Sequence, residues 1–463
     1  PPRSTLFPYT TLFRSGAGHT NPTRVFPIPF TATFSRAVTG FTGTTKITVT
    51  NGKVTTAPTT ANGGLVYTFM VTPNGQGEIT VQVLAAAGKA ATNNNSQASN
   101  VATVVYDTTA PAAVLANLPA NPTTDKTLNV TVGGVGVVTY TWKLDSAAES
   151  AATPVATAIV AAGLADGSHT LQVWGIDAAG NKQATATTFT WTVDTTPPVA
   201  VLANLPVATG NSTNSTVLNA TVGGAGVATY TYSLDGAPES APAAVAVPVA
   251  AAGLPDGPHT LQVWGIDALG NKQVAPTEYT WTVDTVAPVA ELAGAPANPT
   301  NVTSLNVTVG GVGVTHYTYS LDGAPESASR AVAVLVTATG LTNGEHTLRV
   351  WGIDAAGNRQ AVPTEHVWTV DTVAPVAELV AGAPANPTNS TGLNATVGGA
   401  DVAEYTYSLD GGAESAPTNI AVLLFAAGLA DGSHTLRVWG IDALGNKQAR
   451  SEEHTSELQS PNT

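Results

Sequence analysis

The residues from Leu164 to Pro198 read LADGSHTLQVWGIDAAGNKQATATTFTWTVDTTPP, and this stretch decides how the chain is organised. Close copies begin at Leu254 and Leu341. A further copy begins at Leu429 and departs from the pattern after Gln448. One structural unit is therefore used several times in succession.

The element Asp-Thr-x-x-Pro closes each copy and gives the repeat length. It begins at Asp107, Asp194, Asp284 and Asp371, with spacings of 87, 90 and 87 residues. A solenoid repeat of about 20–50 residues cannot bury a core alone, whereas an Ig-type sandwich closes its core with about 100. We therefore expect domains that fold separately. The prolines of these short linkers predict limited bending between neighbours.

The composition excludes several classes of protein. The 463 residues include no cysteine, so no disulfide holds a domain. A net charge of −14 with only 17 Lys and Arg speaks against binding nucleic acid or an anionic membrane. No apolar run approaches the roughly 20 residues of a membrane span.

Strand patterns fill the repeat of residues 194–283. Short alternating segments such as YTYSLDG, HTLQVWGID and EYTWTVD are separated by turn residues, with no helical period. Seven such strands predict an all-β fold, a tandem and elongated array of Ig-like antiparallel β-sandwiches. Alternation predicts these inward side chains: Tyr230, Tyr232, Leu234, Leu261, Val263, Tyr279, Trp281 and Val283.

The unit of residues 16–106 is of a different type. Its first strand alternates at Phe30, Ala32 and Phe34, and Asn51-Gly52 marks a hairpin. The segment PFTATFSRAVTGF resembles the first strands of bacterial Ig-like domains that read pFTvTFSepVtGF, with Arg36 as a local departure.

The repeats share the string YSLDG…GLxDGxHTLxVxxxDxxGN…WTVDTxxP. It resembles the Ig-like repeat of large bacterial surface and adhesin-type proteins, over residues 16–449. The resemblance is specific for the repeat type and weak for any ligand. It implies an extracellular or cell-surface stalk that spaces a distal binding domain, absent from this chain, from the cell.

The two ends do not follow the repeat. Thr5–Ser15 (TLFPYTTLFRS) and Arg450–Ser460 (RSEEHTSELQS) resemble in-frame translations of sequencing adapters. Natural disordered tails are the alternative. The expected domains are residues 16–106, 107–193, 194–283, 284–370 and 371–449, the last lacking its final strand, with non-native segments at 1–15 and 450–463.

Catalytic residues are not expected. One histidine per repeat follows a turn, at His169, His259, His346 and His434. A hydrolase would need a pocket that gathers a nucleophile, a base and a residue that orients the base. A hydrogen bond in the turn is therefore the simpler role for these histidines. The chain has no HExxH and no phosphate-binding loop. We expect no enzyme.

Calcium at the domain junctions is the one cofactor that the sequence suggests, and none is strictly required. Calcium takes six to eight oxygen ligands. The alternative is that Asp-x-x-Gly-Asn caps a turn without metal. The candidate groups are Asp166, Asp194, Asp267 and Asn271; Asp256, Asp284, Asp354 and Asn358; and Asn343, Asp371, Asp442 and Asn446.

Each repeat has a second tryptophan, and the alternation of side chains along its strand predicts that this tryptophan faces outward. An exposed aromatic stripe could bind a sugar or a protein partner. The alternative is a packing residue covered by neighbouring side chains. The outward residues are Trp174, Trp264, Trp351 and Trp439, whereas Trp191, Trp281 and Trp368 are predicted to lie in the core.

The sequence therefore favours a monomeric, non-catalytic spacer of a surface or secreted protein, which meets its ligand through domains outside this chain. The alternative is an array of carbohydrate- or protein-binding modules. Solvent-facing tryptophans would favour the array, and covered ones the spacer.

Overall fold

The computed structural model of the protein describes residues 10–14, 20–60, 62–206 and 210–458. The chain divides into two compact units, Pro1–Pro198 with Ile266–Val274, and Val199–Gly265 with Ala275–Thr463. In the described part the regular structure is β-strand, apart from a single 3-10 turn, η1 (Thr44–Lys46). None of the described segments forms a helix long and apolar enough to cross a membrane.

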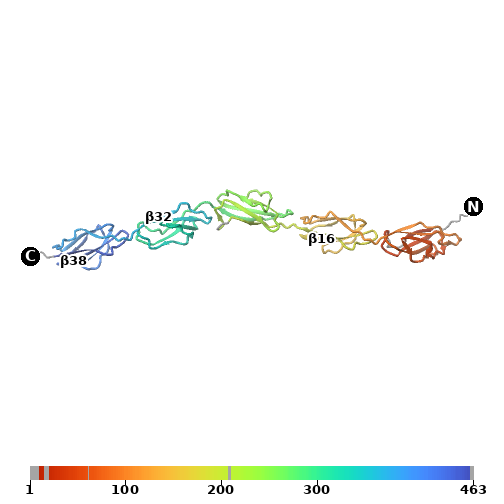
Figure 1. Ribbon diagram of the computed structural model, residues 1–463, viewed down its shortest axis with the longest axis horizontal. Coiled ribbons are helices and arrows are strands. Elements are labelled where there is room, and N and C mark those ends of the chain that lie inside the picture. Colours follow the sequence, from red (N-terminus) through yellow and green to blue (C-terminus); the bar gives the residue numbers. More distant parts are fainter. Residues whose placement is uncertain (1–9, 15–19, 61, 207–209, 459–463) are drawn as a thin grey trace. The chain divides into compact units, whose positions relative to one another are not determined.

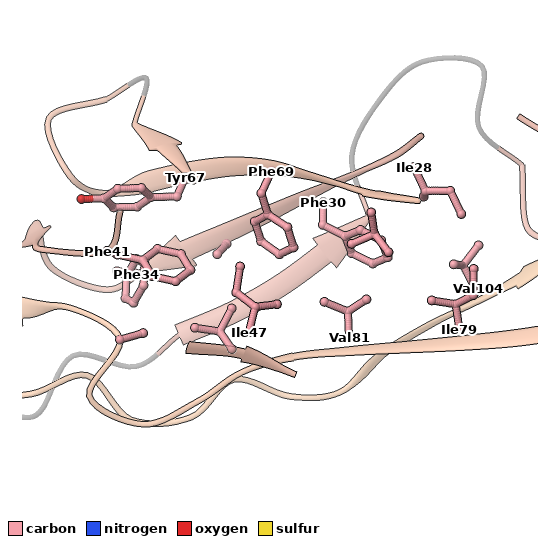
Figure 2. Packing of buried hydrophobic residues seen from close by; sticks show 14 of the residues in the cluster. Ile28, Phe30, Phe34, Phe41, Ile47, Tyr67, Phe69, Ile79, Val81 and Val104 are labelled. Carbon is pink, nitrogen blue, oxygen red and sulfur yellow. The ribbon is translucent and has the colours of Figure 1, made fainter. Parts of the chain in front are cut away.

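The first sandwich packs two sheets around an aromatic core. Figure 2 shows Phe30 and Phe69 side by side, with ring centroids 5.9 Å apart. The Tyr67 hydroxyl donates to the Val38 carbonyl at 2.8 Å. One sheet contains β1 (Thr10–Arg14), β2 (Ile28–Phe34), β7 (Val66–Pro73), β5 (Gly52–Val54) and β6 (Thr59–Thr60); the other contains β10 (Ala102–Tyr106), β8 (Gly77–Val83) and β4 (Ile47–Thr50); β3 (Val38–Thr39) pairs with β9 (Lys89–Ala90).

The four repeats share one strand order, with a three-stranded sheet packed on a sheet of four strands, or five in the third sandwich; β16, β32 and β38 are labelled in Figure 1. The second sandwich places β11 (Val114–Ala116), β12 (Leu128–Gly133) and β15 (Ile159–Ala161) against β14 (Thr153–Pro154), β13 (Thr139–Leu144), β16 (Gly167–Ile176) and β17 (Thr187–Val193). The third places β18 (Val201–Ala203), β20 (Leu218–Gly223) and β23 (Val249–Ala251) against β22 (Ala243–Ala244), β21 (Thr229–Leu234), β24 (Gly257–Ile266), β25 (Thr277–Val283) and the added β19 (Ser212–Thr213).

The fourth and fifth sandwiches repeat this plan. The fourth has β26 (Glu291–Ala293), β27 (Leu305–Gly310) and β30 (Val336–Ala338) against β29 (Arg330–Ala331), β28 (His316–Leu321), β31 (Gly344–Ile353) and β32 (Thr364–Val370). The fifth has β33 (Glu378–Ala381), β34 (Gly392–Gly398) and β37 (Leu424–Ala427) against β36 (Thr418–Asn419), β35 (Glu404–Leu409), β38 (Gly432–Ile441) and β39 (Glu452–Leu458).

The predicted all-β class and the inward pattern are confirmed. In the third sandwich Tyr230, Leu261, Val263, Trp281 and Val283 are buried. The other three predicted core residues, Tyr232, Leu234 and Tyr279, are partly buried and pack against the same cluster. Each of the five sandwiches has a hydrophobic cluster of its own, and no residue belongs to two of them.

Two segments for which the sequence analysis predicted no strand form strands in the structure. Thr10–Arg14 forms β1 and pairs with β2, although most of the segment Thr5–Ser15 lies outside the described residues. Glu452–Leu458 forms β39 and pairs with β38, where the fifth repeat was expected to lack its last strand. An open strand edge presents backbone groups that any extended segment can satisfy, so this pairing does not depend on the side chains of the repeat.

Candidate functional site

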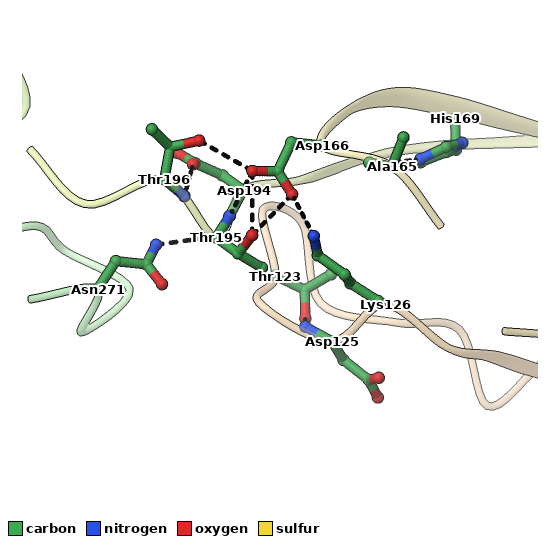
Figure 3. Close-up of polar contacts among 10 residues, drawn as sticks. All are labelled: Thr123, Asp125, Lys126, Ala165, Asp166, His169, Asp194, Thr195, Thr196 and Asn271. Carbon is green, nitrogen blue, oxygen red and sulfur yellow. Dashed lines mark hydrogen bonds and ion pairs between the residues drawn. The ribbon is translucent and has the colours of Figure 1, made fainter. Parts of the chain in front are cut away.

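Polar side-chain contacts recur at the linkers between sandwiches. Asp166 lies in the turn before β16, and its carboxylate accepts hydrogen bonds from the linker that follows β17 (Figure 3). Both the Thr195 and the Thr196 hydroxyl lie 2.8 Å from it. Lys126 adds an ion pair at 3.1 Å. Hydrogen bonds from Thr195, then Thr196 and Lys126, hold the pKa of Asp166 well below its usual value.

The same contact recurs at the next two linkers. Asp256 accepts from the Thr285 hydroxyl at 2.8 Å and from its backbone N–H at 3.0 Å. Asn343 replaces the aspartate and accepts from the Thr372 hydroxyl at 2.7 Å and its N–H at 3.0 Å. Because an amide oxygen serves as well as a carboxylate, the contact needs an acceptor and no negative charge.

The first sandwich reaches its linker with a different residue. The Gln76 side chain accepts from the Thr108 N–H at 3.0 Å and donates to the Thr108 and Thr109 hydroxyls at 2.8 and 2.7 Å. Sequence reasoning missed this contact because the first sandwich is of another type and lacks the Asp-Gly turn of the repeats.

From the other side, an Asp-x-x-Gly-Asn turn of the following sandwich holds each linker. The asparagine donates one N–H to the backbone carbonyl of the linker aspartate and the other to the first aspartate of its own turn. The linker contacts are Asn181 to Asp107 at 2.8 Å, Asn271 to Asp194 at 3.0 Å (Figure 3), Asn358 to Asp284 at 2.6 Å and Asn446 to Asp371 at 2.8 Å.

The turn itself is fixed by its own hydrogen bonds. In the fourth sandwich the Asp354 carboxylate accepts the Asn358 backbone N–H and its side-chain amide, both at 2.8 Å. Gly357 has a φ of 92°, a backbone conformation that residues other than glycine rarely adopt. The asparagine is thus presented to the linker in one orientation.

We call this arrangement the linker clamp: an acceptor of the preceding sandwich (Gln76, Asp166, Asp256 or Asn343) and an asparagine of the following one (Asn181, Asn271, Asn358 or Asn446). The linker aspartate adds a turn of its own, as where Asp194 accepts the Thr196 N–H at 3.0 Å. The groups predicted at the junctions did not include Asp177 and Asn181 at the first junction. The string DAAGN is nevertheless present there, as the same type of string is at the other three junctions.

The clamp brings together the residues that were predicted to hold calcium, but as hydrogen-bond partners. Asn271 turns its N–H groups toward Asp194 and Asp267, so a donor faces the oxygens that a cation would need. Within the described ranges no group of three or more His, Cys, Asp or Glu side chains is placed to hold a metal ion. This donor set does not fit calcium in the arrangement described.

The repeated histidines make the turn contacts that were predicted for them. His169 Nδ1 lies 2.8 Å from the Asp145 carboxylate, and Nε2 lies 2.8 Å from the Ala165 carbonyl. Both partners are acceptors only, so both bonds require a doubly protonated ring. The Ala165 carbonyl and the Asp145 carboxylate accordingly raise the pKa of His169.

The same histidine contact occurs in every repeat, and sequence reasoning missed its aspartate. A constant spacing of 24 residues in the sequence was the signal that could have found it. The other pairs are His259 with Asp235 at 2.8 Å, His346 with Asp322 at 2.8 Å and His434 with Asp410 at 2.6 Å.

The outward tryptophans are half-buried, and a cation covers the ring in three repeats. Lys182, Arg359 and Lys447 lie 5.2, 4.9 and 5.6 Å from the ring centroids of Trp174, Trp351 and Trp439, respectively. Each cation is also paired with a glutamate, namely Glu149, Glu326 or Glu414. Trp264 is half-buried in β24 as well. These rings resemble packing residues more than an open platform, and the binding role stays a prediction.

Comparisons with known proteins give likenesses of structure only. No family description matches the chain, and no curated protein is similar to it in sequence. A tetra-tandem repeat from the extending region of a large adhesion protein is 16% identical with a TM-score of 0.33, over 79% of this chain and 100% of that one. A Ca²⁺-stabilized adhesin that helps an Antarctic bacterium reach out and bind ice is 19% identical with a TM-score of 0.30, over 77% and 100%.

A third likeness is to fibronectin(III)-like modules of Clostridium thermocellum CbhA, which are 15% identical with a TM-score of 0.24, over 37% of this chain and 95% of that one. At such identities and scores, what those proteins bind stays a property of those proteins.

Proposed function

We propose that this chain is a non-catalytic structural spacer of a bacterial cell-surface or secreted adhesin-like protein, which presents a distal domain outside this chain. The observation that carries the proposal is the linker clamp. At all four linkers an acceptor of the preceding sandwich takes the backbone N–H of the first linker threonine, although the acceptor changes from Gln76 to Asp166, Asp256 and Asn343. A bond that is kept while its residues vary is what a mechanical role of the linker requires.

The energetics fit this role. Each hydrogen bond contributes about 1 kcal/mol net, so several bonds on a linker of five residues restrain it without merging the neighbouring cores. A Gly/Ser linker would instead behave as a flexible coil. Separate cores and restrained linkers are the two properties that a spacer needs in order to keep its reach.

The alternative, an array of carbohydrate- or protein-binding modules, has weaker support. It depends on open aromatic rings, and Trp174, Trp351 and Trp439 each lie against a cation that is itself paired with a glutamate. Location outside the cell follows in either case from the resemblance of the repeat.

The test removes one clamp from both sides. The double variant Asp256→Ala, Asn358→Ala frees the linker that begins at Asp284, and the matched control Gln262→Ala removes a surface hydrogen bond to Glu278 on a strand. Loss of bonds worth about 1 kcal/mol each should raise the rate of non-specific proteolysis at this linker about tenfold. Small-angle scattering should show a broader distance distribution for the double variant.

The control should match the parent chain in both measurements. Thermal unfolding is measured on all three proteins, because Asn358 also donates to Asp354 in its own turn and its loss lowers the stability of the fourth sandwich. Equal cleavage rates in the double variant and the control would show that the clamp restrains nothing, and the spacer proposal would lose its main support.

A further inference from the structure

Asn343, the linker-clamp acceptor of the fourth sandwich, is followed directly by Gly344, and this pair of residues is chemically labile. In an Asn-Gly sequence the backbone nitrogen of the glycine can attack the side-chain carbonyl carbon of the asparagine, because no side chain on the glycine blocks the approach. The chain contains three other Asn-Gly pairs, which begin at Asn51, Asn62 and Asn74. They provide references for Asn343 within the same molecule.

The backbone around Asn343 is open to this reaction. Asn343 and Gly344 are both exposed, so water reaches the reacting atoms. Gly344 has a φ of 130°, and a Cβ placed on it would meet no atom within 4 Å outside its chain neighbours. The chain therefore has room to move where the side chain and the next backbone nitrogen must join.

The hydrogen bonds of the Asn343 side chain lie on the atom that remains in the product. Its Oδ1 accepts from the Thr372 hydroxyl at 2.7 Å and from the Thr372 N–H at 3.0 Å. Within the described chain, its amide nitrogen has no hydrogen-bond partner. During the attack Oδ1 gains negative charge while the nitrogen leaves, so both bonds to Thr372 strengthen and neither has to break.

Asn51 shows the opposite arrangement. Its amide nitrogen donates to the carbonyls of Gly75, Gln76 and Glu78 at 3.2, 3.1 and 3.4 Å. These bonds are on the atom that would leave, and they must be broken before ammonia can depart. Asn51 is also half-buried. The same dipeptide is therefore protected in the first sandwich and unprotected in the fourth.

We propose that Asn343 is a site of spontaneous deamidation. The Gly344 nitrogen bonds to the Asn343 Cγ and gives up its proton, the side-chain amide takes up a proton and leaves as ammonia, and a succinimide ring remains. Water then opens the ring at one or the other of its carbonyls, which gives aspartate or isoaspartate. The overall reaction consumes water and releases ammonia, and it needs no oxidant, reductant or cofactor.

The two products have different effects on the linker clamp. Aspartate is the residue that the second and third sandwiches have at this position, and Asp256 accepts the same pair of bonds, from the Thr285 hydroxyl at 2.8 Å and its N–H at 3.0 Å. Conversion to aspartate thus keeps the clamp and adds a negative charge. Isoaspartate routes the main chain through the side-chain methylene, which lengthens the backbone before β31 and shortens the arm that reaches Thr372. This product therefore opens the clamp at the linker that begins at Asp371.

The experiment ages the full chain in neutral buffer at physiological temperature and follows each Asn-Gly pair by peptide mapping with mass spectrometry. Asn343 should convert at least about tenfold faster than Asn51, which is the factor that about 1.4 kcal/mol of barrier gives. Thr372→Val removes the hydroxyl donor and keeps the N–H, and it should slow the conversion of Asn343 about fivefold, as expected for one hydrogen bond. The exposed Asn74 is the matched control, whose rate should not change in this variant.

The effect on the linker is measured by non-specific proteolysis. Asn343→Asp gives the aspartate product directly, and its linker at Asp371 should be cleaved as slowly as that of the fresh parent chain. In the aged chain, cleavage at this linker should rise with the isoaspartate fraction, which fragmentation by electron transfer distinguishes from aspartate, and cleavage at the linker that begins at Asp284 should stay unchanged.

Conversion of Asn343 no faster than that of Asn51, or faster conversion in Thr372→Val than in the parent chain, would overturn the proposal. Hydrogen exchange of the β31 amides, measured on the fresh variant, checks that its fourth sandwich is folded. The mass measurement does not depend on whether the linker clamp restrains the chain, so its failure is distinguishable from failure of the spacer proposal.

Discussion

The fourth and fifth sandwiches have the same strand order and differ most in their last strands. The fourth ends in Thr364–Val370, TEHVWTV, and the fifth in Glu452–Leu458, EEHTSEL. Both strands place a glutamate beside an arginine of the neighbouring strand, at 2.7 Å for Arg349 and 3.2 Å for Arg437. Surface contacts and backbone pairing are therefore alike in the two sandwiches.

The cores are not alike. Trp368 is fully buried in the fourth cluster, and the same register of the fifth sandwich holds the much smaller Ser456. The comparison teaches that an extended segment can satisfy the edge of a sheet without completing the core. Backbone hydrogen bonds accept many sequences, whereas a close-packed interior accepts few.

The largest effect should come from making the fourth sandwich like the fifth. Trp368→Ser removes a fully buried indole, and substitutions of this kind cost about 3–5 kcal/mol. Hydrogen exchange measured by mass spectrometry should show lower protection of β31 and β32 and leave the second sandwich unchanged. The control Val367→Ser changes a neighbouring side chain that is 37% exposed, and it should cost less than about 0.5 kcal/mol. Similar losses for the two variants would contradict the comparison.

The reverse change should have a smaller effect of opposite sign. Ser456→Trp places an indole opposite His434, and burial of a large apolar side chain would contribute about 1.5–3 kcal/mol if it fitted fully. Repacking around the cavity of about 10 Å³ that Ser456 borders reduces the gain to about 1 kcal/mol. The protection of β38 amides against hydrogen exchange measures it, with Thr455→Trp on the outer face as control. A loss of protection in Ser456→Trp would mean that β39 does not lie in the register of its sisters.

Periodicity and repetition were enough for sequence reasoning to predict separate β-sandwiches and a buried Trp281. That reasoning failed where function depends on contacts between distant segments. The asparagine of the DAAGN-type turn was noticed as an oxygen ligand, but its N–H groups make the contacts, and side-chain orientation is not written in a motif. The His169–Asp145 pair was missed because its members lie 24 residues apart and meet only when β13 pairs with β16. The strand at Glu452–Leu458 was missed because pairing at an edge places little demand on sequence.

A pH titration compares the histidines of the two sandwiches. The Asp322 carboxylate and the Thr342 carbonyl raise the pKa of His346 against the opposing effect of burial, and the Ala430 carbonyl and Asp410 raise that of His434. A raised pKa in the folded state gives stability that is fully present below the unfolded value of about 6.5 and is lost as pH rises through the folded pKa. Both sandwiches should therefore lose stability as the pH rises through the folded pKa values of these histidines.

Proton NMR of the imidazole rings and hydrogen exchange at pH values below and above these pKa values measure this effect. Asp322→Asn should return the pKa of His346 toward its ordinary value and remove most of the pH dependence of the fourth sandwich, while the fifth keeps its own. Loss of the pH dependence in both sandwiches at once would show that the two histidines do not act separately.

The smallest effect should come from removing divalent cations, because the linker clamp is made of hydrogen bonds at the linkers that precede both sandwiches. Asn358 donates to the Asp284 carbonyl and Asn446 to the Asp371 carbonyl, so neither group offers calcium a set of free oxygens. Excess chelator should shift the melting temperature by less than about 1 °C, which corresponds to a few tenths of a kcal/mol for domains of this size. Asn446→Asp supplies a carboxylate in place of the amide donor, and this variant alone should gain stability with added calcium. A large chelator effect on the parent chain would restore calcium as a ligand and would require Asn358 and Asn446 to turn their amide oxygens toward the linker.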